Sequence, residues 1–303
     1  MQVEVLMATH NGEKFIHKML DSLASQVGVQ IDLVVSDDNS MDKTIEIVHS
    51  FRNSFNSLNI MNGPDLGPKH NFAKLIQNSR GKFSAFADQD DIWLPDHLKL
   101  SIDRLILHDS VPALVFSKVT EFSNSGTSSE WPTLDQSPQL STWLTENFAR
   151  GCTIVMNREL IDLIRKSDFN QIYMHDWWSV LVAKTCGILE FLPYPTIEYR
   201  IHDGNVVGAK KSLIRRSRLF LRTYFSNGGW VPQRQAAQLL AEFSFMMTLD
   251  NSKLVNKFVN IADHSFIQRY IFLYQSKFNF RQSNFENILL KFMLLLFPRK
   301  VNN

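Results

Sequence analysis

Three carboxylates occur within four positions of the sequence, at Asp88, Asp90 and Asp91, directly after the apolar run 83–87. Carboxylates this close repel one another, so the cluster is costly unless positive charge or solvent offsets it. A divalent cation, a group of Arg or Lys side chains, or water would each do so. Mg²⁺ typically takes one or two carboxylates together with phosphate oxygens and water. We therefore interpret Asp88 and Asp90 as ligands of a cation that holds a diphosphate.

A fourth acidic residue, Asp176, follows His175 and precedes two tryptophans, Trp177 and Trp178. Neighbouring aromatic side chains could partly desolvate this carboxylate and raise its pKa, which suits a general base. The structural alternative is a helix N-cap at Asp176 with the tryptophans in the core. The local sequence favours neither interpretation.

The stretch 199–205 combines the guanidinium of Arg200, the imidazole of His202 and a turn that contains Gly204. A lone histidine is more often a structural or surface residue than a ligand. Beside a guanidinium and a turn, His202 becomes a candidate contact for a metal or a phosphate.

The elements that must position these residues alternate in the first half of the chain between apolar strands and amphipathic helices. The pattern predicts strands at 3–8, 31–35, 58–61 and 83–87, and helices at 12–26, 42–51, 71–79 and 95–108. Ser40 fits the N-cap of the second helix. Strands that alternate with helices indicate an α/β fold with a mostly parallel, Rossmann-like sheet covered by helices on both faces.

Polar loops follow three of the predicted strands, and ligands of an open parallel sheet bind beyond the carboxyl ends of its strands. Each loop alone fits a turn or a helix cap. Three such loops at equivalent strand ends predict one binding site. The loops are Thr9-His10-Asn11, Ser36-Asp37-Asp38-Asn39-Ser40 and Asp88-Gln89-Asp90-Asp91.

The second half of the chain predicts strands at 113–119 and 152–156, helices at 158–165 and 177–185, and extended segments at 188–192 and 196–201. The polar, Ser/Thr/Pro-rich stretch 123–138 is interpreted as an irregular loop. From about residue 210 the pattern becomes helical and basic, so we expect a mainly helical C-terminal extension.

The composition of the 303-residue chain indicates a globular protein, since 44% of its residues are hydrophobic and 20% are charged. A net charge of +2 gives no sign of a nucleic-acid partner. The two cysteines, Cys152 and Cys186, fit free thiols in a reducing compartment. The N-terminus lacks the features of a signal peptide, and the longest apolar stretch, 288–297, is too short to span a bilayer. These patterns predict a cytoplasmic protein.

The region after Asp203 is strongly basic, because it contains seven Lys and Arg residues and no acidic residue before Glu242. In the predicted helix 211–225, basic residues recur every three or four positions opposite an apolar face. A helix packed on the core with a solvated basic face would give this pattern, and so would a helix on an anionic membrane surface. The apolar segment 288–297 favours peripheral contact with the inner face of the plasma membrane.

The order of the motifs resembles the family 2 glycosyltransferases, and among them the bacterial rhamnosyltransferase-like members. The resemblance implies a GT-A domain over residues 1–208, followed by a helical, basic and apolar region at 209–303. It rests on Met7-Ala8-Thr9-His10-Asn11-Gly12, Ser36-Asp37-Asp38-Asn39-Ser40, Ala87-Asp88-Gln89-Asp90-Asp91-Ile92-Trp93, His175-Asp176-Trp177-Trp178 and Tyr199-Arg200-Ile201-His202.

The resemblance also implies roles for single residues. Asp90 would be the main ligand of Mg²⁺ or Mn²⁺, Asp88 would reach the ribose or the metal, and Asp176 would be the catalytic base. His202 would add a metal or diphosphate contact, with Arg200 near it. The implied contacts to the base and ribose of a nucleotide-sugar donor are Ala8, Thr9, His10, Asn11 and Asp38, and the segment that contacts the sugar begins at Gly151 and Cys152.

Two departures from the family pattern matter for function. His10 stands where relatives usually have a Tyr that packs near the base, which leaves the choice of base open. The Gln-x-x-Arg-Trp motif of processive polysaccharide synthases is absent, which argues for one sugar added per encounter.

We therefore expect an inverting, metal-dependent transfer of a single sugar, with rhamnose as a candidate. The donor would be UDP- or dTDP-linked, and the acceptor a saccharide or a lipid-linked oligosaccharide in bacterial surface polysaccharide synthesis. One alternative is a catalytically inactive protein of the same fold that binds a nucleotide-sugar or a partner. The other is a metal-dependent nucleotidyl or phosphoryl transferase.

Overall fold

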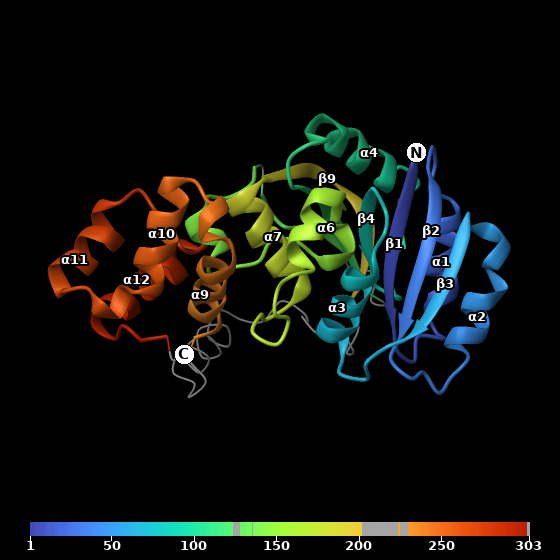
Figure 1. Cartoon of the computed structure of the whole chain (residues 1–303), viewed down its shortest axis with the longest axis horizontal. Helices are drawn as coiled ribbons and strands as arrows, with labels where there is room; N and C mark the ends of the chain where they lie inside the picture. Colours follow the sequence, from blue (N-terminus) through green and yellow to red (C-terminus); the bar gives the residue numbers. More distant parts are fainter. Residues whose placement is uncertain (124–127, 135, 202–223, 225–229, 302–303) are drawn as a thin grey trace.

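The computed structural model describes residues 1–123, 128–134, 136–201, 224 and 230–301, and it contains one large sheet with helices on both faces (Figure 1). All neighbouring strands are parallel except those that involve β8, β5 or β7, so the sheet is mixed. The predicted α/β fold, with helices on both faces of the sheet, is confirmed. Across the sheet the order is β3 (Ser57–Asn62), β2 (Gln30–Asp37), β1 (Gln2–Thr9), β4 (Phe83–Ala87), β8 (Val155–Asn157), β6 (Ala113–Ser123), β9 (Ile188–Ile201) and β5 (Ile92–Trp93), and β7 (Ser128–Trp131) pairs with β6.

The helices form two layers around this sheet. One layer contains α1 (Ile16–Ala24), α2 (Thr44–Ser50) and α4 (His97–Leu105). The other layer contains α3 (Pro68–Asn78), α5 (Leu140–Trp143), α6 (Arg158–Ile164) and α7 (His175–Cys186). The C-terminal helices are α9 (Val231–Phe243), α10 (Leu249–Val259), α11 (Phe266–Tyr270), which a π-helix (Ile271–Gln275) continues, and α12 (Asn284–Leu296).

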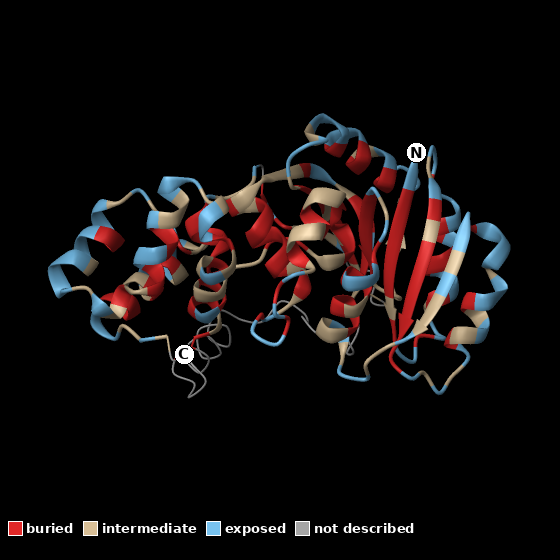
Figure 2. Ribbon diagram, in the orientation of Figure 1, coloured by how far each residue is buried: buried red, intermediate tan, exposed pale blue. Residues whose placement is uncertain are grey.

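The hydrophobic core lies on both faces of the sheet, as expected for strands that read as nearly continuous apolar runs. Successive side chains of β1 alternate between the two layers. Val5 and Met7 pack in the layer of α1 and α4, and Leu6 packs in the layer of α3 and α7. Figure 2 shows the central strands and the inward faces of these helices as buried.

Two predicted segments in the second half of the chain differ from the structure. Part of the expected loop at 123–138 forms β7, which pairs antiparallel with the outer end of β6. The extended segments at 188–192 and 196–201 join into the single strand β9. The β6–β9 register shifts at Lys118, which pairs with Pro195, because a proline cannot donate a hydrogen bond to the ladder.

The predicted N-cap at Ser40 is wrong. Helix α2 starts at Thr44, with Lys43 in the N-cap position. The Ser40 hydroxyl instead donates to Asp37 at 2.6 Å and accepts a hydrogen bond from the backbone N of Asn11 at 2.8 Å. Ser40 therefore ties together the loops that follow β1 and β2.

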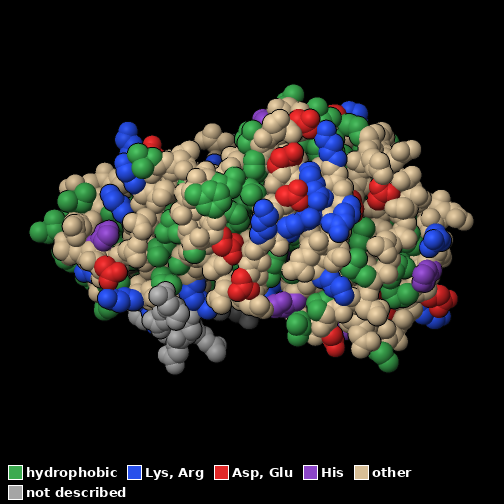
Figure 3. All heavy atoms as spheres, viewed as in Figure 1, with side chains coloured by type: hydrophobic (Ala, Val, Ile, Leu, Met, Phe, Trp, Pro, Cys, Tyr) green, Lys and Arg blue, Asp and Glu red, His purple; other side chains and the backbone are tan. Residues whose placement is uncertain are grey.

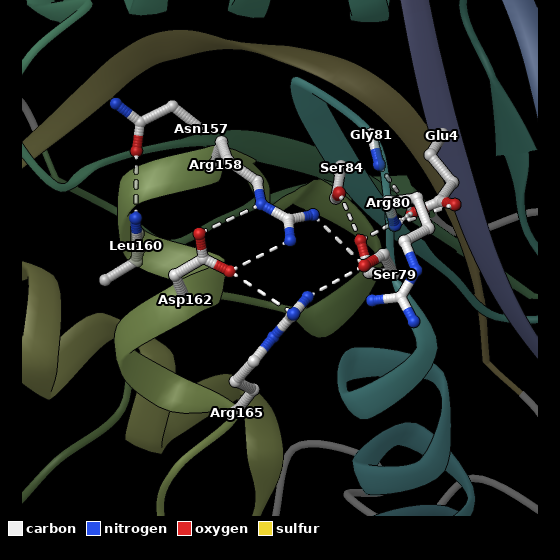
Figure 4. A network of polar contacts seen from close by, with 10 residues as sticks. All are labelled: Glu4, Ser79, Arg80, Gly81, Ser84, Asn157, Arg158, Leu160, Asp162 and Arg165. Atoms are coloured by element: carbon white, nitrogen blue, oxygen red, sulfur yellow. Dashed lines mark hydrogen bonds and ion pairs between the residues drawn. The ribbon is translucent and has the colours of Figure 1, made fainter.

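A buried carboxylate, Glu4 of β1, lies at the other end of the parallel strands, away from the loops that follow β1 and β2 (Figure 4). Glu4 accepts hydrogen bonds from the Ser79 hydroxyl and from the backbone N of Arg80 and of Gly81. These groups form the turn between α3 and β4, so Glu4 fixes the entry into β4 and thereby the register of the acidic turn at its far end.

The C-terminal helices share the core of the second layer. The hydroxyls of Ser141 and Thr142 on α5 both donate to the Asn279 carbonyl at 2.7 Å. The predicted domain boundary at 208 and the predicted basic helix 211–225, apart from Tyr224, lie outside the described residues. Among the helices that the structure describes, none has the length and hydropathy needed to cross a bilayer.

Replacing Glu4 with Ala should lower the free energy of unfolding by about 2–3 kcal/mol, because one buried hydroxyl and two partly buried backbone N–H groups would lose their acceptor. Urea denaturation measures this loss. Asp162→Ala is a matched control, since Asp162 belongs to the neighbouring arginine network in Figure 4 but its side chain is 45% exposed. That variant should lose less than about 1 kcal/mol. Equal losses in the two variants would contradict the assigned role of Glu4.

Candidate active site

A cavity of about 390 Å³ opens at the carboxyl ends of β1, β2 and β4, at the lower edge of the sheet in Figure 1. The starts of α3 and α7 and the segment 150–151 complete its walls. This is the location that parallel strand ends predict for a ligand. The predicted site residues that line the cavity are Ala8, Thr9, His10, Asp38, Asp88, Asp90, Gly151 and Asp176.

Three predicted site residues do not line the cavity. Asn11 lies in the loop after β1, where its side-chain oxygen accepts from the backbone N of Met41. Cys152 is buried behind the cavity wall. The Arg200 guanidinium donates to the Asp90 carbonyl at 3.0 Å and stacks on Phe122 at 4.6 Å. A further predicted site residue, His202, lies outside the described residues.

The loops after β1 and β4 are joined by Gln89. Its side chain accepts from the backbone N of His10 at 3.0 Å and donates to the His10 carbonyl at 2.9 Å. A β-carbon at Gly12 would lie 2.3 Å from the Gln89 side-chain oxygen, so this pairing requires glycine there. Gln89 therefore aligns the nearby carboxylates with the first strand.

The buried carboxylate Asp38 shapes another wall of the cavity. It accepts hydrogen bonds from the backbone N of Asp65 at 3.1 Å and of Gly67 at 3.2 Å. Gly67 has a φ of +81°, a conformation that favours glycine, and it immediately precedes α3. Asp38 thus holds the 63–67 loop against the start of α3, with an oxygen-rich surface facing the cavity.

Negative charge accumulates on the opposite wall. Burial, Asp90 and Asp176 raise the pKa of Asp88 to about 7, although the Arg150 guanidinium acts to lower it. Asp90 also lines the cavity, and its negative charge contributes to the raised pKa of both Asp88 and Asp91. Groups whose pKa is pushed upward in a cavity are candidates for function, because the protein has placed charge where water solvates it poorly.

Asp91, the last acidic residue of the turn, does not line the cavity. Asp91 is buried, and it accepts hydrogen bonds from the backbone N of Arg200 at 3.2 Å and from the Cys152 thiol. Burial, together with Asp90 and Asp88, raises its pKa well above the ordinary value. Asp91 is therefore a structural tie that joins the β4–β5 turn to β9 and to the segment after Gly151.

Asp176 lies in the first turn of α7, and the N-cap is Met174, so the capping interpretation of Asp176 is wrong. The tryptophans that follow are in the core, as that interpretation expected. Burial raises the pKa of Asp176 to about 6, while hydrogen bonds from the backbone N of Trp177 at 2.7 Å and from the Asn147 side chain at 3.1 Å favour its charged form. This environment keeps Asp176 largely ionised at neutral pH yet basic enough to accept a proton.

Arg150 lines the cavity and was missed by the sequence analysis. Its guanidinium donates to Glu121 at 2.8 Å and lies between the rings of Trp131 and Tyr199, at 4.3 and 4.7 Å from their centroids. It acts to lower the pKa of both Asp88 and Asp176. The only sequence signal was an arginine directly before Gly151, in a segment that the resemblance linked to sugar contact.

His175 also lines the cavity, and neither of its ring nitrogens has a hydrogen-bond partner among the described residues. The ring stacks on Phe72 with centroids 3.8 Å apart and is only 4% exposed, and burial lowers its pKa to about 3. A neutral imidazole in this position offers one donor and one acceptor to a ligand.

The donor set of the acidic wall fits a hard divalent cation. Asp88, Asp91 and Cys152 place ligand atoms within 4.8 Å of one another, and the second carboxylate oxygen of Asp91 has no hydrogen-bond partner among the described residues. Burial raises the pKa of the Cys152 thiol, so this sulfur stays protonated and bonds to Asp91. The carboxylates that face the cavity are Asp88 and Asp90, as the sequence analysis predicted for a cation site.

Comparison with known protein sequences gives a consistent result. The profile of the family described as Glycosyl transferase family 2 matches residues 4–165. The dTDP-rhamnosyl transferase RfbG of Shigella flexneri is 32% identical over an alignment of 219 residues that covers 68% of this chain and 75% of that protein. The UDP-Glc:alpha-D-GlcNAc-diphosphoundecaprenol beta-1,3-glucosyltransferase WfgD of Escherichia coli is 25% identical over an alignment of 227 residues that covers 71% of this chain and 83% of that protein.

Solved structures show the same fold. TarS 1–349 of Staphylococcus aureus, crystallised in complex with UDP, superposes with a TM-score of 0.58 at 16% identity, over 89% of this chain and 74% of that one. The mannosyltransferase PcManGT of Pyrobaculum calidifontis, in complex with GDP-Man and Mn²⁺, gives a TM-score of 0.51 at 14% identity, over 98% of this chain and 88% of that one. The sheet with its two helical layers is thus the GT-A architecture.

The raised pKa of Asp88 predicts a stability effect that depends on pH. The folded state binds this proton more tightly than the unfolded state, whose pKa is near 3.8, so ionisation of Asp88 destabilises the fold as the pH rises from about 4 to about 7. In the presence of a chelator, Asp88→Asn should be more stable than the unsubstituted protein by roughly 1–3 kcal/mol near pH 8, with the gap closing near pH 4. Urea denaturation across this range measures it, and a gap that does not change with pH would contradict the prediction.

Proposed function

Because the chain belongs to glycosyltransferase family 2, we propose that it transfers a single sugar from a nucleotide-diphosphate sugar to a saccharide or lipid-linked acceptor, with inversion at the anomeric carbon. Rhamnose from a dTDP-linked donor is the first candidate, since the Shigella relative is a dTDP-rhamnosyl transferase. The name of the Escherichia coli relative gives a diphosphoundecaprenol-linked acceptor, so a lipid-linked acceptor is a candidate here, and such an acceptor would suit bacterial surface polysaccharide synthesis.

The observation that carries this proposal is the meeting of two kinds of acidic group in one cavity. Asp88 and Asp90 come from the turn after β4, and Asp176 comes from the first turn of α7. A carboxylate that holds a cation is a poor base, so transfer requires a separate carboxylate for the proton. Asp176, which comes from a different part of the chain than the turn after β4, would be this second carboxylate.

We assign the donor nucleotide to the walls after β1 and β2. Thr9, His10 and Asp38 line that side, and Asp38 presents carboxylate oxygens suited to ribose hydroxyls or base N–H groups. The His10 ring is anchored through Nδ1 to the Asp38 carbonyl at 2.6 Å. The imidazole face would therefore be available to stack on the base.

The diphosphate would lie toward Asp88 and Asp90, which would hold Mg²⁺ or Mn²⁺. A bound divalent cation would neutralise charge that develops on the departing diphosphate. The Arg150 guanidinium, in the same cavity wall, acts to lower the pKa of Asp88 and of Asp176. It would also contribute positive charge to the binding of the phosphates.

We assign the catalytic proton transfer to Asp176. The acceptor hydroxyl gives its proton to the Asp176 carboxylate as its oxygen bonds to the anomeric carbon, and the bond from that carbon to the diphosphate oxygen breaks on the opposite face. Asn147 and the Trp177 backbone N orient the carboxylate. His175, one residue earlier, would hydrogen-bond to a sugar hydroxyl through a ring nitrogen that has no partner among the described residues.

Replacing Asp176 with Asn should lower the rate of transfer by about 10²–10⁴-fold, because the acceptor would lose its base. Donor affinity should change little, since the substitution leaves the donor wall intact. Product analysis and calorimetric binding with dTDP-rhamnose, UDP-glucose and GDP-mannose measure both quantities and identify the donor. In the unsubstituted enzyme, activity should fall below about pH 6 as Asp176 becomes protonated. Normal turnover by the variant would place the base elsewhere.

Excess chelator should abolish transfer, and added Mg²⁺ or Mn²⁺ should restore it. Asp90→Asn should prevent this rescue because one carboxylate ligand is lost, at a cost of about 10²-fold or more in rate. Asp91→Asn is a matched control, because its amide oxygen can still accept from the Arg200 backbone N. Full activity in chelator would remove the metal from the mechanism. Loss of the metal rescue in Asp91→Asn alone would instead assign the cation to the Asp88, Asp91 and Cys152 cluster.

A further inference from the structure

The C-terminal helix α12 has apolar side chains on two opposite faces. Leu290, Met293 and Leu294 point into the core and are almost fully buried. The opposite face repeats at intervals of three and four residues, which places its side chains in one row along the helix. This row consists of Phe285, Ile288, Phe292 and Leu296, which are 42–64% exposed.

The neighbouring helix α11 and the π-helix that follows it expose a second row. This row consists of Ile267, Tyr270, Ile271 and Tyr274, which are 40–69% exposed. The rings of Tyr270 and Tyr274 stack with centroids 5.4 Å apart, and Lys291 of α12 lies 5.9 Å from the Tyr274 ring centroid, so the two rows adjoin. We call these eight side chains the apolar face. Figure 3 shows hydrophobic side chains at the left end of the molecule, where Figure 1 places α11.

Positive charge surrounds the apolar face. Residues 244–301 contain eight Lys or Arg residues against three Asp or Glu residues. Lys253 and Lys257 of α10 line a groove of about 610 Å³ that also contains Ile271 of the apolar face and one carboxylate, Asp250. Lys253, Lys257 and Lys291 have no ion-pair partner among the described residues.

We propose that the apolar face, with Lys253, Lys257 and Lys291 beside it, is the surface by which this protein binds the interface of an anionic lipid bilayer. A row of aromatic and branched aliphatic side chains next to lysines matches the acyl boundary and the phosphate layer of such a bilayer. Docking of a second copy on the same face would bring these lysines together, which like-charge repulsion opposes. The proposal agrees with a lipid-linked acceptor in the proposed function, but it rests on the surface alone.

The test is sedimentation of the full chain with vesicles, without donor or acceptor. Binding should be strong on phosphatidylcholine vesicles with roughly 30% phosphatidylglycerol, weaker on pure phosphatidylcholine, and weakened by salt. The double variant Ile288→Gln/Phe292→Gln should bind about ten-fold more weakly, because it removes apolar contact while keeping helix propensity. The triple variant Lys253→Gln/Lys257→Gln/Lys291→Gln should lose the preference for anionic vesicles.

Ile106→Gln/Leu107→Gln is the matched control, since these two side chains are 46% and 70% exposed outside the C-terminal helices. This variant should bind vesicles like the unsubstituted protein, and all variants should keep the same melting temperature and the same activity on a water-soluble acceptor. Equal binding by the control and the α12 variant would overturn the proposal. So would sedimentation velocity that shows a dimer which the α12 variant converts to monomers without any vesicle binding. Loss of transferase activity at Asp176 or Asp90 leaves this assay unchanged, so the two proposals fail separately.

Discussion

The structure depends on one electrostatic constraint, which is the concentration of carboxylates at the carboxyl ends of the parallel strands. Asp88, Asp90 and Asp91 occupy one short turn, and Asp176 faces the same cavity from α7. Burial raises the pKa of Asp88 and Asp176 to about 7 and 6, so the fold gives up stability to keep these groups together. Arg150 offsets part of this cost from the same wall.

The surrounding contacts show how the chain maintains this costly arrangement. Gln89 pairs with the His10 backbone, and Asp91 binds the backbone of Arg200, so the acidic turn is fixed to β1 on one side and to β9 on the other. At the far end of β4, Glu4 fixes the turn through which the chain enters that strand. The acidic turn therefore cannot move away from the cavity without breaking these hydrogen bonds.

The sequence predicted the parts of this site that depend on local pattern. Alternating apolar strands and amphipathic helices placed the loops after β1, β2 and β4 at one edge, and Asp38, Asp88, Asp90 and Asp176 all line the cavity. Arg150 could not be predicted, because its position depends on Trp131 of β7, within a stretch that reads as loop. The sequence does not reveal β7, because the strand is polar, none of its four residues is buried, and its conformation is set by the pairing with β6.

The different environments of Asp88 and Asp176 imply that the two carboxylates serve different functions. Asp176 receives hydrogen bonds from a backbone N and from Asn147, which favour its charged form, whereas Asp88 has Asp90 and Asp176 among the causes of its raised pKa. Near neutral pH Asp88 is therefore the group that holds a proton more readily. A cation that uses Asp88 must displace this proton, so its affinity would rise with pH up to about 7. As the pH rises from about 6 to about 7, Asp176 would therefore be deprotonated and able to act as the base, and Asp88 would become a better cation ligand.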